Sequence, residues 1–213
     1  FDKEAAKFFL ERANNNVGLI IPGIAPLRDT IWGRWLWQNP KMFDELKEFM
    51  DEIHKTGAKL FVQLTAGMGR SWAITDHVAP LHKNKVLRTI AKPILDTSYQ
   101  LMSPSELPSR WDPSITTPAM TIDQIHEIIE AFAKTAKLCK DAGVDGVEVH
   151  AVHEGYLLDQ FTMDWTNKRT DEYGGSFENR YRFATDIVKA IKERCGKDFP
   201  VSLRYSVESK VKD

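Results

Sequence analysis

The chain has 213 residues, with 29 Lys and Arg against 30 Asp and Glu, so its formal net charge is −1. A balance this close to neutral creates no global field that would attract nucleic acid or an acidic membrane. The length suits one full-sized hydrophobic core, and no apolar run approaches the ~20 residues that span a bilayer.

The chain contains two cysteines, Cys139 and Cys195, and both fall within helical patterns. They provide neither a disulfide framework nor the spacing of a metal site. We therefore expect no metal site and a reducing, cytoplasmic location. The chain lacks an initiator Met and stops soon after a predicted strand. We therefore expect an internal fragment of a longer protein.

The first part of the chain alternates helices and short apolar strands. We expect helices over residues 2–14 and from Asn39-Pro40 to Gly57, because Asn caps a helix, Pro suits its first turn and Gly ends it. Strands are predicted over residues 17–21 and 60–64. Residues 65–121 do not repeat this pattern, and we interpret them as a long functional excursion or lid that contains short strands or turns.

The second part repeats the alternation more clearly. Thr121 and Gln124 form a capping box before a helix that Gly143 ends, and a strand is predicted over residues 144–149. A second helix runs from its cap at Ser176 to Gly196, and a strand follows over residues 201–205. The series predicts an α/β fold with a parallel sheet and right-handed crossovers. Four such units are too few to close an eight-stranded barrel.

Groups able to handle protons and anions follow the strand over residues 144–149. His150 and His153 can donate hydrogen bonds to a carbonyl oxygen or an anionic ring, or they can be loop histidines that face solvent. Tyr156 can deliver a proton to a carbanion, or it can cap the core as an aromatic side chain. Zinc is disfavoured, because no third Cys or His stands at a standard offset.

Two polar residues interrupt strands that are otherwise apolar. Arg204 places a guanidinium within the strand over residues 201–205, where a buried Arg requires an anionic ligand or a carboxylate from a neighbouring strand. Gln63 places an amide, with its adjacent donor and acceptor, in the strand over residues 60–64. Together they suggest one ligand across the strand ends, and the alternative is a satisfied internal hydrogen bond.

The glycines in this sequence have structural interpretations. Gly67 and Gly69 do not form a dinucleotide-binding fingerprint. Gly174 and Gly175 are typical of a tight turn into a capped helix. We interpret the arginines that follow, at positions 180 and 182, as structural ion-pair partners rather than catalysts.

The segments EVHAVHEGYLLDQF and TNKRTDEYGGSFENRYRF closely resemble the old yellow enzyme family of flavin-dependent reductases. The shorter segments GLIIPGIAP, FVQLTAGMGR and VSLRYS extend the resemblance over most of the chain. It is nearest to the larger bacterial NADH:flavin oxidoreductases, such as 2,4-dienoyl-CoA reductase, trimethylamine dehydrogenase and the bile-acid-inducible ene-reductases. The resemblance implies that residues 1–213 are part of a single FMN-binding TIM (β/α)8 barrel domain, truncated at both ends, with roughly four parallel strands.

The resemblance also implies roles for individual residues in cofactor binding. Gly23 matches a residue that lies against the flavin, and Gln63 matches the residue that hydrogen-bonds the pyrimidine edge of the isoalloxazine. Arg204 matches the cation near flavin N1 and O2, where a positive charge favours the anionic reduced flavin.

The implied catalytic residues are His150, His153 and Tyr156. The two histidines match the pair that binds the activating carbonyl of the substrate, and Tyr156 matches the proton donor. Family members often carry Gly-Tyr directly after this pair, whereas Glu154 is interposed here, so the role of each histidine stays open.

The implied activity is that of an ene-reductase, in which NAD(P)H reduces FMN and hydride then passes to an activated C=C bond. The expected substrate is a small enone, enoyl-CoA or steroid-like molecule, and a homo-oligomer is compatible with the resemblance. Flavin-dependent amine dehydrogenation and an inactive barrel fragment are the alternatives.

The larger relatives carry a 4Fe–4S cluster and an FAD domain beyond the barrel, which implies the same for the missing C-terminal part. The fragment alone is expected to bind FMN weakly.

Overall fold

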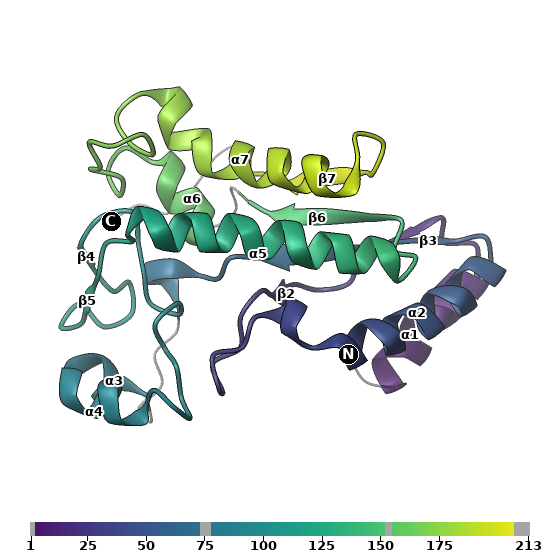
Figure 1. Ribbon diagram of the computed structural model, residues 1–213, viewed down its shortest axis with the longest axis horizontal. Helices are drawn as coiled ribbons and strands as arrows, with labels where there is room; N and C mark the ends of the chain where they lie inside the picture. Colours follow the sequence, from purple (N-terminus) through teal and green to yellow (C-terminus); the bar gives the residue numbers. More distant parts are fainter. Residues whose placement is uncertain (1–2, 73–77, 152–154, 207–213) are drawn as a thin grey trace.

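A computed structural model describes residues 3–72, 78–151 and 155–206. At its centre lies a parallel sheet with the strand order β1-β3-β6-β7, and β2 also pairs with β3 (Figure 1). The predicted parallel α/β organisation is therefore confirmed. The strands are β1 Leu19–Ile20, β2 Ala25–Pro26, β3 Lys59–Thr65, β6 Gly146–His150 and β7 Val201–Arg204.

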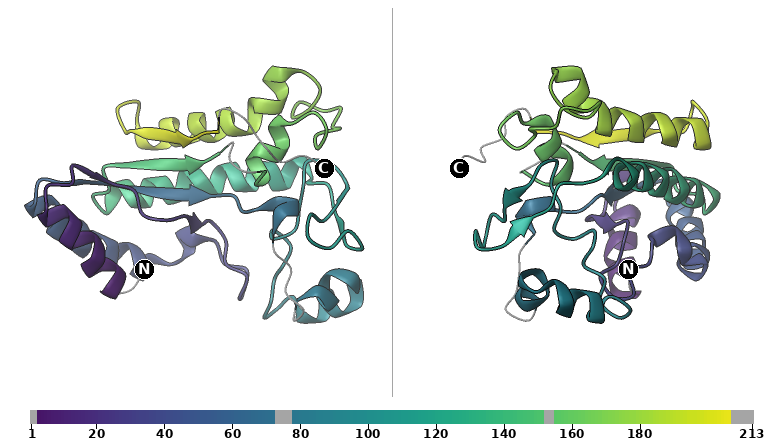
Figure 2. Two further views of the ribbon diagram at one scale, coloured as in Figure 1. Left: turned by 180° about the vertical axis from the view of Figure 1, so that it is seen from behind. Right: turned by 60° about the vertical axis from the view of Figure 1, so that its left-hand side comes forward.

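The longer helices follow the predicted order. Helices α5 and α7 lie side by side against the sheet, while α1 and α2 pack together near β1 (Figure 2). The bounds of the longer helices are α1 Lys3–Asn14, α2 Pro40–Lys55, α5 Ile122–Asp141 and α7 Phe177–Cys195, and the short helix α6 spans Leu157–Thr162. The short helix α6 was not predicted.

The core lies between the sheet and the helices α5 and α7. Phe132 of α5 and Phe183 and Ile187 of α7 are fully buried in the same cluster as Val147 and Val149 of β6. Burying side chains of this size contributes roughly 1.5–3 kcal/mol each. This apolar contact fixes one face of β6 against the helices and directs its alternate residues to the other face.

The predicted helix caps are confirmed, with one exception. Thr121 Oγ1 accepts a hydrogen bond from the Gln124 N–H at 3.2 Å, and Gln124 Oε1 accepts from the Thr121 N–H at 3.0 Å. Ser176 Oγ likewise accepts from the Asn179 N–H. Asn39 precedes α2 as expected, but its side chain forms no capping hydrogen bond. Its backbone (φ −114°, ψ 78°) departs from the extended geometry seen at Thr121 and Ser176.

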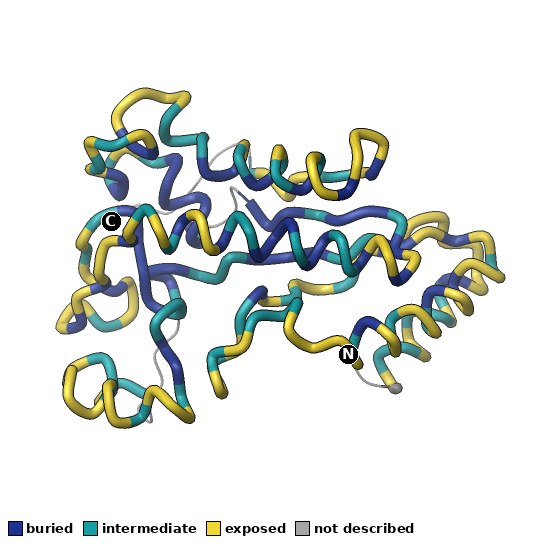
Figure 3. The backbone as a smooth tube through the Cα atoms, in the orientation of Figure 1, coloured by how far each residue is buried: buried dark blue, intermediate teal, exposed yellow. Residues whose placement is uncertain are grey.

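The excursion contains more structure than the sequence predicted. Its antiparallel pair β4 Leu107–Pro108 and β5 Thr116–Thr117 agrees with the expectation of short strands. Two helices, α3 and α4, form a largely exposed lobe (Figures 1 and 3). They have five and seven residues, too few to show a helical period in the sequence. The remaining short elements are η1 Leu36–Gln38, η2 Gly69–Ser71, α3 Ala79–Lys83 and α4 Lys85–Ala91.

None of the helices in the described ranges has the length and apolar character needed to cross a membrane.

Asp145, just before β6, ties that strand to the start of β3. Its carboxylate accepts a hydrogen bond from the Leu60 N–H at 3.0 Å and contacts His54 at 2.9 Å and Lys59 at 3.0 Å. Burial opposes ionisation of Asp145, but these three partners outweigh it and lower the pKa of the carboxyl group. The ionised carboxylate therefore stabilises the folded state.

The lowered pKa of Asp145 predicts a pH-dependent effect of Asp145→Asn. A depressed carboxyl pKa stabilises the fold above the unfolded-state value of about 3.9, and the contribution is lost as the pH falls through the folded-state pKa. We expect Asp145→Asn to lower the free energy of unfolding at pH 7 by about 1 kcal/mol, with the difference shrinking below about pH 4.

Denaturant unfolding at several pH values measures this difference. Asp141→Asn is the control, because Asp141 makes an exposed ion pair with Lys137 and should change stability by less than about 0.5 kcal/mol. A loss in Asp145→Asn that is the same at pH 3 and pH 7 would contradict the prediction.

Candidate functional site

Six polar side chains occupy one face of the sheet in two rows across β3, β6 and β7. Strand pairing sets three residues in each row at matching positions, and the side chains of alternate residues point to the same face. This face is opposite the one that Val147 and Val149 bury in the core. We call this set the polar ladder; its lower row is Gln63, Glu148 and Ser202, and its upper row is Thr65, His150 and Arg204.

The lower row is joined by hydrogen bonds. Gln63 Nε2 donates to Glu148 Oε1 at 2.5 Å, and Ser202 Oγ donates to Glu148 Oε2 at 3.1 Å. Gln63 is only 5 % exposed, and Glu148 is half-buried. One carboxylate therefore holds the polar groups of both neighbouring strands.

The upper row lies at the carboxyl ends of the strands. Thr65 Oγ1 lies 3.2 Å from His150 Nδ1 and accepts a hydrogen bond from the Gly67 N–H at 3.1 Å. These contacts orient the His150 imidazole, which is 3 % exposed. In α/β barrels, reactive groups lie at the carboxyl ends of the parallel strands.

The structure corrects the expected environment of Arg204. The sequence predicted a guanidinium surrounded by apolar strand neighbours, but Arg204 is exposed, as are Leu203 and Tyr205. The cause is the position of β7 at the edge of the described sheet. Pairing with His150 still places Arg204 in the upper row of the polar ladder.

Tyr156 lies beside His150. It immediately precedes α6, is half-buried, and its ring centroid is 5.1 Å from that of His150 at an interplanar angle of 58°. The backbone just before it is anchored, because Ser71 Oγ and Gln160 Nε2 both donate to the Gly155 carbonyl. The structure thus brings together two of the three predicted catalytic residues; the third, His153, lies outside the described residues.

A cavity of about 530 Å³ connects two of the predicted cofactor-binding residues. Gly23 and Gln63 both line it, together with apolar side chains of α2 such as Phe43 and Leu46. A Cβ on Gly23 would meet nothing within 4 Å, so this backbone leaves room for a group laid against it. The described residues that line the cavity do not include Arg204, His150 or Tyr156. The predicted residues therefore do not share one cavity.

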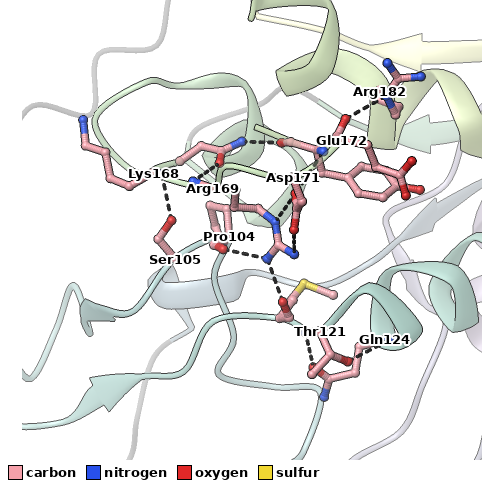
Figure 4. A network of polar contacts seen from close by, with 12 residues as sticks. Pro104, Ser105, Thr121, Gln124, Lys168, Arg169, Asp171, Glu172 and Arg182 are labelled. Carbon is pink, nitrogen blue, oxygen red and sulfur yellow. Dashed lines mark hydrogen bonds and ion pairs between the residues drawn. The ribbon is translucent and has the colours of Figure 1, made fainter. Parts of the chain in front are cut away.

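The segment TNKRTDEYGGSFENRYRF holds the chain through Arg169 and Asp171. We call this pair, with the Pro104 and Met120 carbonyls that it binds, the clamp. Arg169, whose side chain is 8 % exposed, pairs with Asp171 at 2.6 Å and donates to the Pro104 carbonyl at 2.9 Å and the Met120 carbonyl at 2.6 Å (Figure 4). Burial opposes ionisation of Asp171, but the hydrogen bonds from Arg169 and from the Tyr173 N–H outweigh it and lower the pKa of its carboxyl group. The clamp therefore joins both ends of the β4–β5 segment to the turn before α7.

Arg180 and Arg182 have the structural role that the sequence indicated, through different partners. Arg180 Nε donates to the Thr162 carbonyl at 2.8 Å, and Arg182 Nε donates to the Glu172 carbonyl at 2.7 Å. Their contacts within the described residues are with carbonyl and amide oxygens rather than with carboxylates.

Sequence analysis missed three members of the polar ladder: Thr65, Glu148 and Ser202. Glu148 lies within the run over residues 144–149, which was interpreted as simply apolar. The alternation Val-Glu-Val was the available signal, because it places Glu148 on the opposite face from its neighbours. Among the described residues, no group of three or more His, Cys, Asp or Glu could hold a metal ion.

Comparison with known proteins gives consistent matches. The family model described as NADH:flavin oxidoreductase / NADH oxidase matches residues 2–213. Cinnamate reductase of Clostridium sporogenes is 41 % identical over 220 residues, which cover 100 % of this chain and 30 % of that protein. The chain therefore spans about a third of the length of this relative.

Solved structures with the same fold include an Old Yellow Enzyme and a 2-naphthoyl-CoA reductase. An Old Yellow Enzyme from a Pichia species superimposes with a TM-score of 0.68 at 28 % identity, covering 95 % of this chain and 50 % of that one. A 2-naphthoyl-CoA reductase in complex with 2-naphthoyl-CoA superimposes with a TM-score of 0.70 at 27 % identity, covering 93 % of this chain and 29 % of that one. The expected partial (β/α)8 barrel is thereby confirmed.

The clamp predicts a strong effect of adding one methyl group at Gly174. A Cβ there would lie 2.3 Å from the Arg169 carbonyl oxygen, and backbone cannot move aside as a side-chain tip can. We expect Gly174→Ala to lower the free energy of unfolding by roughly 1–3 kcal/mol. Gly18→Ala is the control, because its Cβ would meet nothing within 4 Å. Equal stability of the two variants in denaturant unfolding would contradict this account of the clamp.

Proposed function

The chain belongs to the FMN-dependent NADH:flavin oxidoreductase / NADH oxidase family, and from this premise we propose that it forms the substrate-binding part of an ene-reductase. In this activity, hydride passes from NAD(P)H through FMN to an activated C=C bond. We further propose that residues 1–213 are part of one barrel domain.

One observation carries the proposal: an oriented imidazole and a phenol lie side by side at the carboxyl end of a central strand. The ring of Tyr156 is 5.1 Å from that of His150, whose Nδ1 is held by Thr65. Reduction of an activated alkene requires a hydrogen-bond donor for the carbonyl oxygen and a weak acid that protonates a neighbouring carbon.

The polar ladder provides groups that fit FMN. Gln63 offers an amide with both donor and acceptor character to the pyrimidine edge of the flavin. Gly23, where a Cβ would meet nothing within 4 Å, leaves room for a ring against its backbone. Arg204 places a positive charge on the same face, where it would favour the anionic reduced form of a bound flavin. FMN, when bound, supplies the hydride chemistry that links NAD(P)H to the alkene.

The chain's own residues then act on the substrate. His150 donates a hydrogen bond to the activating carbonyl and stabilises the enolate oxygen as negative charge develops on it. Tyr156 donates its phenolic proton to the α-carbon, since a phenol stays protonated at neutral pH and can act as a general acid. Thr65 holds the imidazole in place throughout.

The proposed substrate is a small α,β-unsaturated carbonyl compound, and a cinnamate-like acid is the first choice. The support is the 41 % identity to a cinnamate reductase. The His150 and Tyr156 pair accounts for recognition of the enoyl group.

The assigned roles predict that Tyr156→Phe separates the two half-reactions. We expect reduction of the enzyme-bound flavin by NADH to change by less than about threefold, while reoxidation by cinnamate slows by about 100-fold or more, which is the usual contribution of a general acid. Anaerobic stopped-flow absorbance of the complete, FMN-loaded protein measures both rates.

Tyr173→Phe is the matched control, since it removes a phenol whose hydroxyl donates to Asp186 of α7. Equal loss in both half-reactions of Tyr156→Phe would remove Tyr156 from the proton-donor role. Reduction of the flavin by a secondary or tertiary amine instead of NADH would replace the ene-reductase proposal with amine dehydrogenation.

A further inference from the structure

Glu148 occupies the centre of the lower row of the polar ladder. Its carboxylate is half-buried on the middle strand and accepts hydrogen bonds from Gln63 on one side and Ser202 on the other. Among the described residues, no Lys or Arg forms an ion pair with it. A half-buried carboxylate without a cationic partner is costly, so its two hydrogen bonds are the interactions that keep it in place.

We propose that Glu148 is a positioning residue that fixes the orientation of the Gln63 amide. An ionised carboxylate only accepts hydrogen bonds, so the group of Gln63 that faces it at 2.5 Å must be the NH2 group. The two faces of an amide have nearly the same shape, and a neutral neighbour would tolerate either orientation. Ser202 occupies the other carboxylate oxygen and holds the carboxylate in the plane of the row.

A fixed amide has a defined ligand preference. With its NH2 group directed to Glu148, Gln63 has its carbonyl oxygen, and one remaining N–H, left for a ligand bound on the face of the polar ladder. The complementary ligand edge carries an N–H donor next to a carbonyl acceptor. The pyrimidine ring of FMN has this edge at N3–H and its neighbouring carbonyls, so the inference rests on the proposed function and deepens it.

The flipped amide would oppose this edge with the wrong polarity. The NH2 group of Gln63 would then face the N3–H group, donor against donor, and a mismatch of this kind costs about tenfold or more in affinity. Glu148→Gln makes the flip accessible, because the new amide can donate to the Gln63 carbonyl as well as accept from its NH2 group. The substitution keeps the shape of the side chain, so the fold should be retained.

The test measures Kd values for two ligands on the flavin-free form of the complete protein. FMN carries the N3–H donor, whereas N3-methyl-FMN lacks it. Quenching of flavin fluorescence reports the binding of each ligand. We expect Glu148→Gln to weaken FMN binding by about tenfold and N3-methyl-FMN binding by less than about twofold. The Kd of N3-methyl-FMN divided by the Kd of FMN would therefore fall by about tenfold, towards 1.

Glu193→Gln is the matched control, because it makes the same chemical change on the exposed surface of α7. It should leave both Kd values unchanged. The thermal unfolding midpoint of each flavin-free variant shows whether folding is retained.

Two outcomes would overturn the inference: equal weakening of both ligands in Glu148→Gln, which indicates a merely structural carboxylate, or unchanged binding of both. Failure of the unaltered protein to bind either flavin would instead overturn the proposed function. The two failures are thus distinguishable.

Discussion

The parallel register of β3, β6 and β7 is the constraint on which the site depends. It sets Gln63 beside Glu148 and Thr65 beside His150, and it carries Arg204 to the same face. A slip of β6 by one residue would turn Glu148 and His150 towards the helices and bring Val147 and Val149 to the ladder face. The buried apolar contacts of β6 with α5 and α7 therefore hold the polar face in place from the opposite side of the sheet.

The segments that carry the family resemblance contain two kinds of residue. His150 and Tyr156 lie together at the carboxyl end of β6, where we propose that they donate to an oxygen and a carbon of the substrate. Arg169 and Gly174 instead hold the chain in shape, the first through carbonyls of the β4–β5 segment and the second by leaving room for the Arg169 backbone. A specific sequence motif thus marks both chemistry and the scaffold that positions it.

Sequence reasoning predicted the features that depend on local patterns. The capping box at Thr121 and the cap at Ser176 depend on side chains three residues apart, and the central strands show as short apolar runs. Two features depended on tertiary context instead. The exposure of Arg204 follows from its edge strand, and the role of Glu148 follows from its neighbours in β3 and β7. Helices α3 and α4 were missed because each is too short to show a period.

The central claim is that the polar ladder is the binding surface of a flavin ring. A crystal structure of the complete protein soaked with FMN tests it most directly. The account predicts the pyrimidine edge of the isoalloxazine within hydrogen-bond distance of the Gln63 amide, with the Arg204 guanidinium beside the same ring. Density for FMN at another place, with Gln63 and Arg204 both occupied by protein groups, would contradict the account.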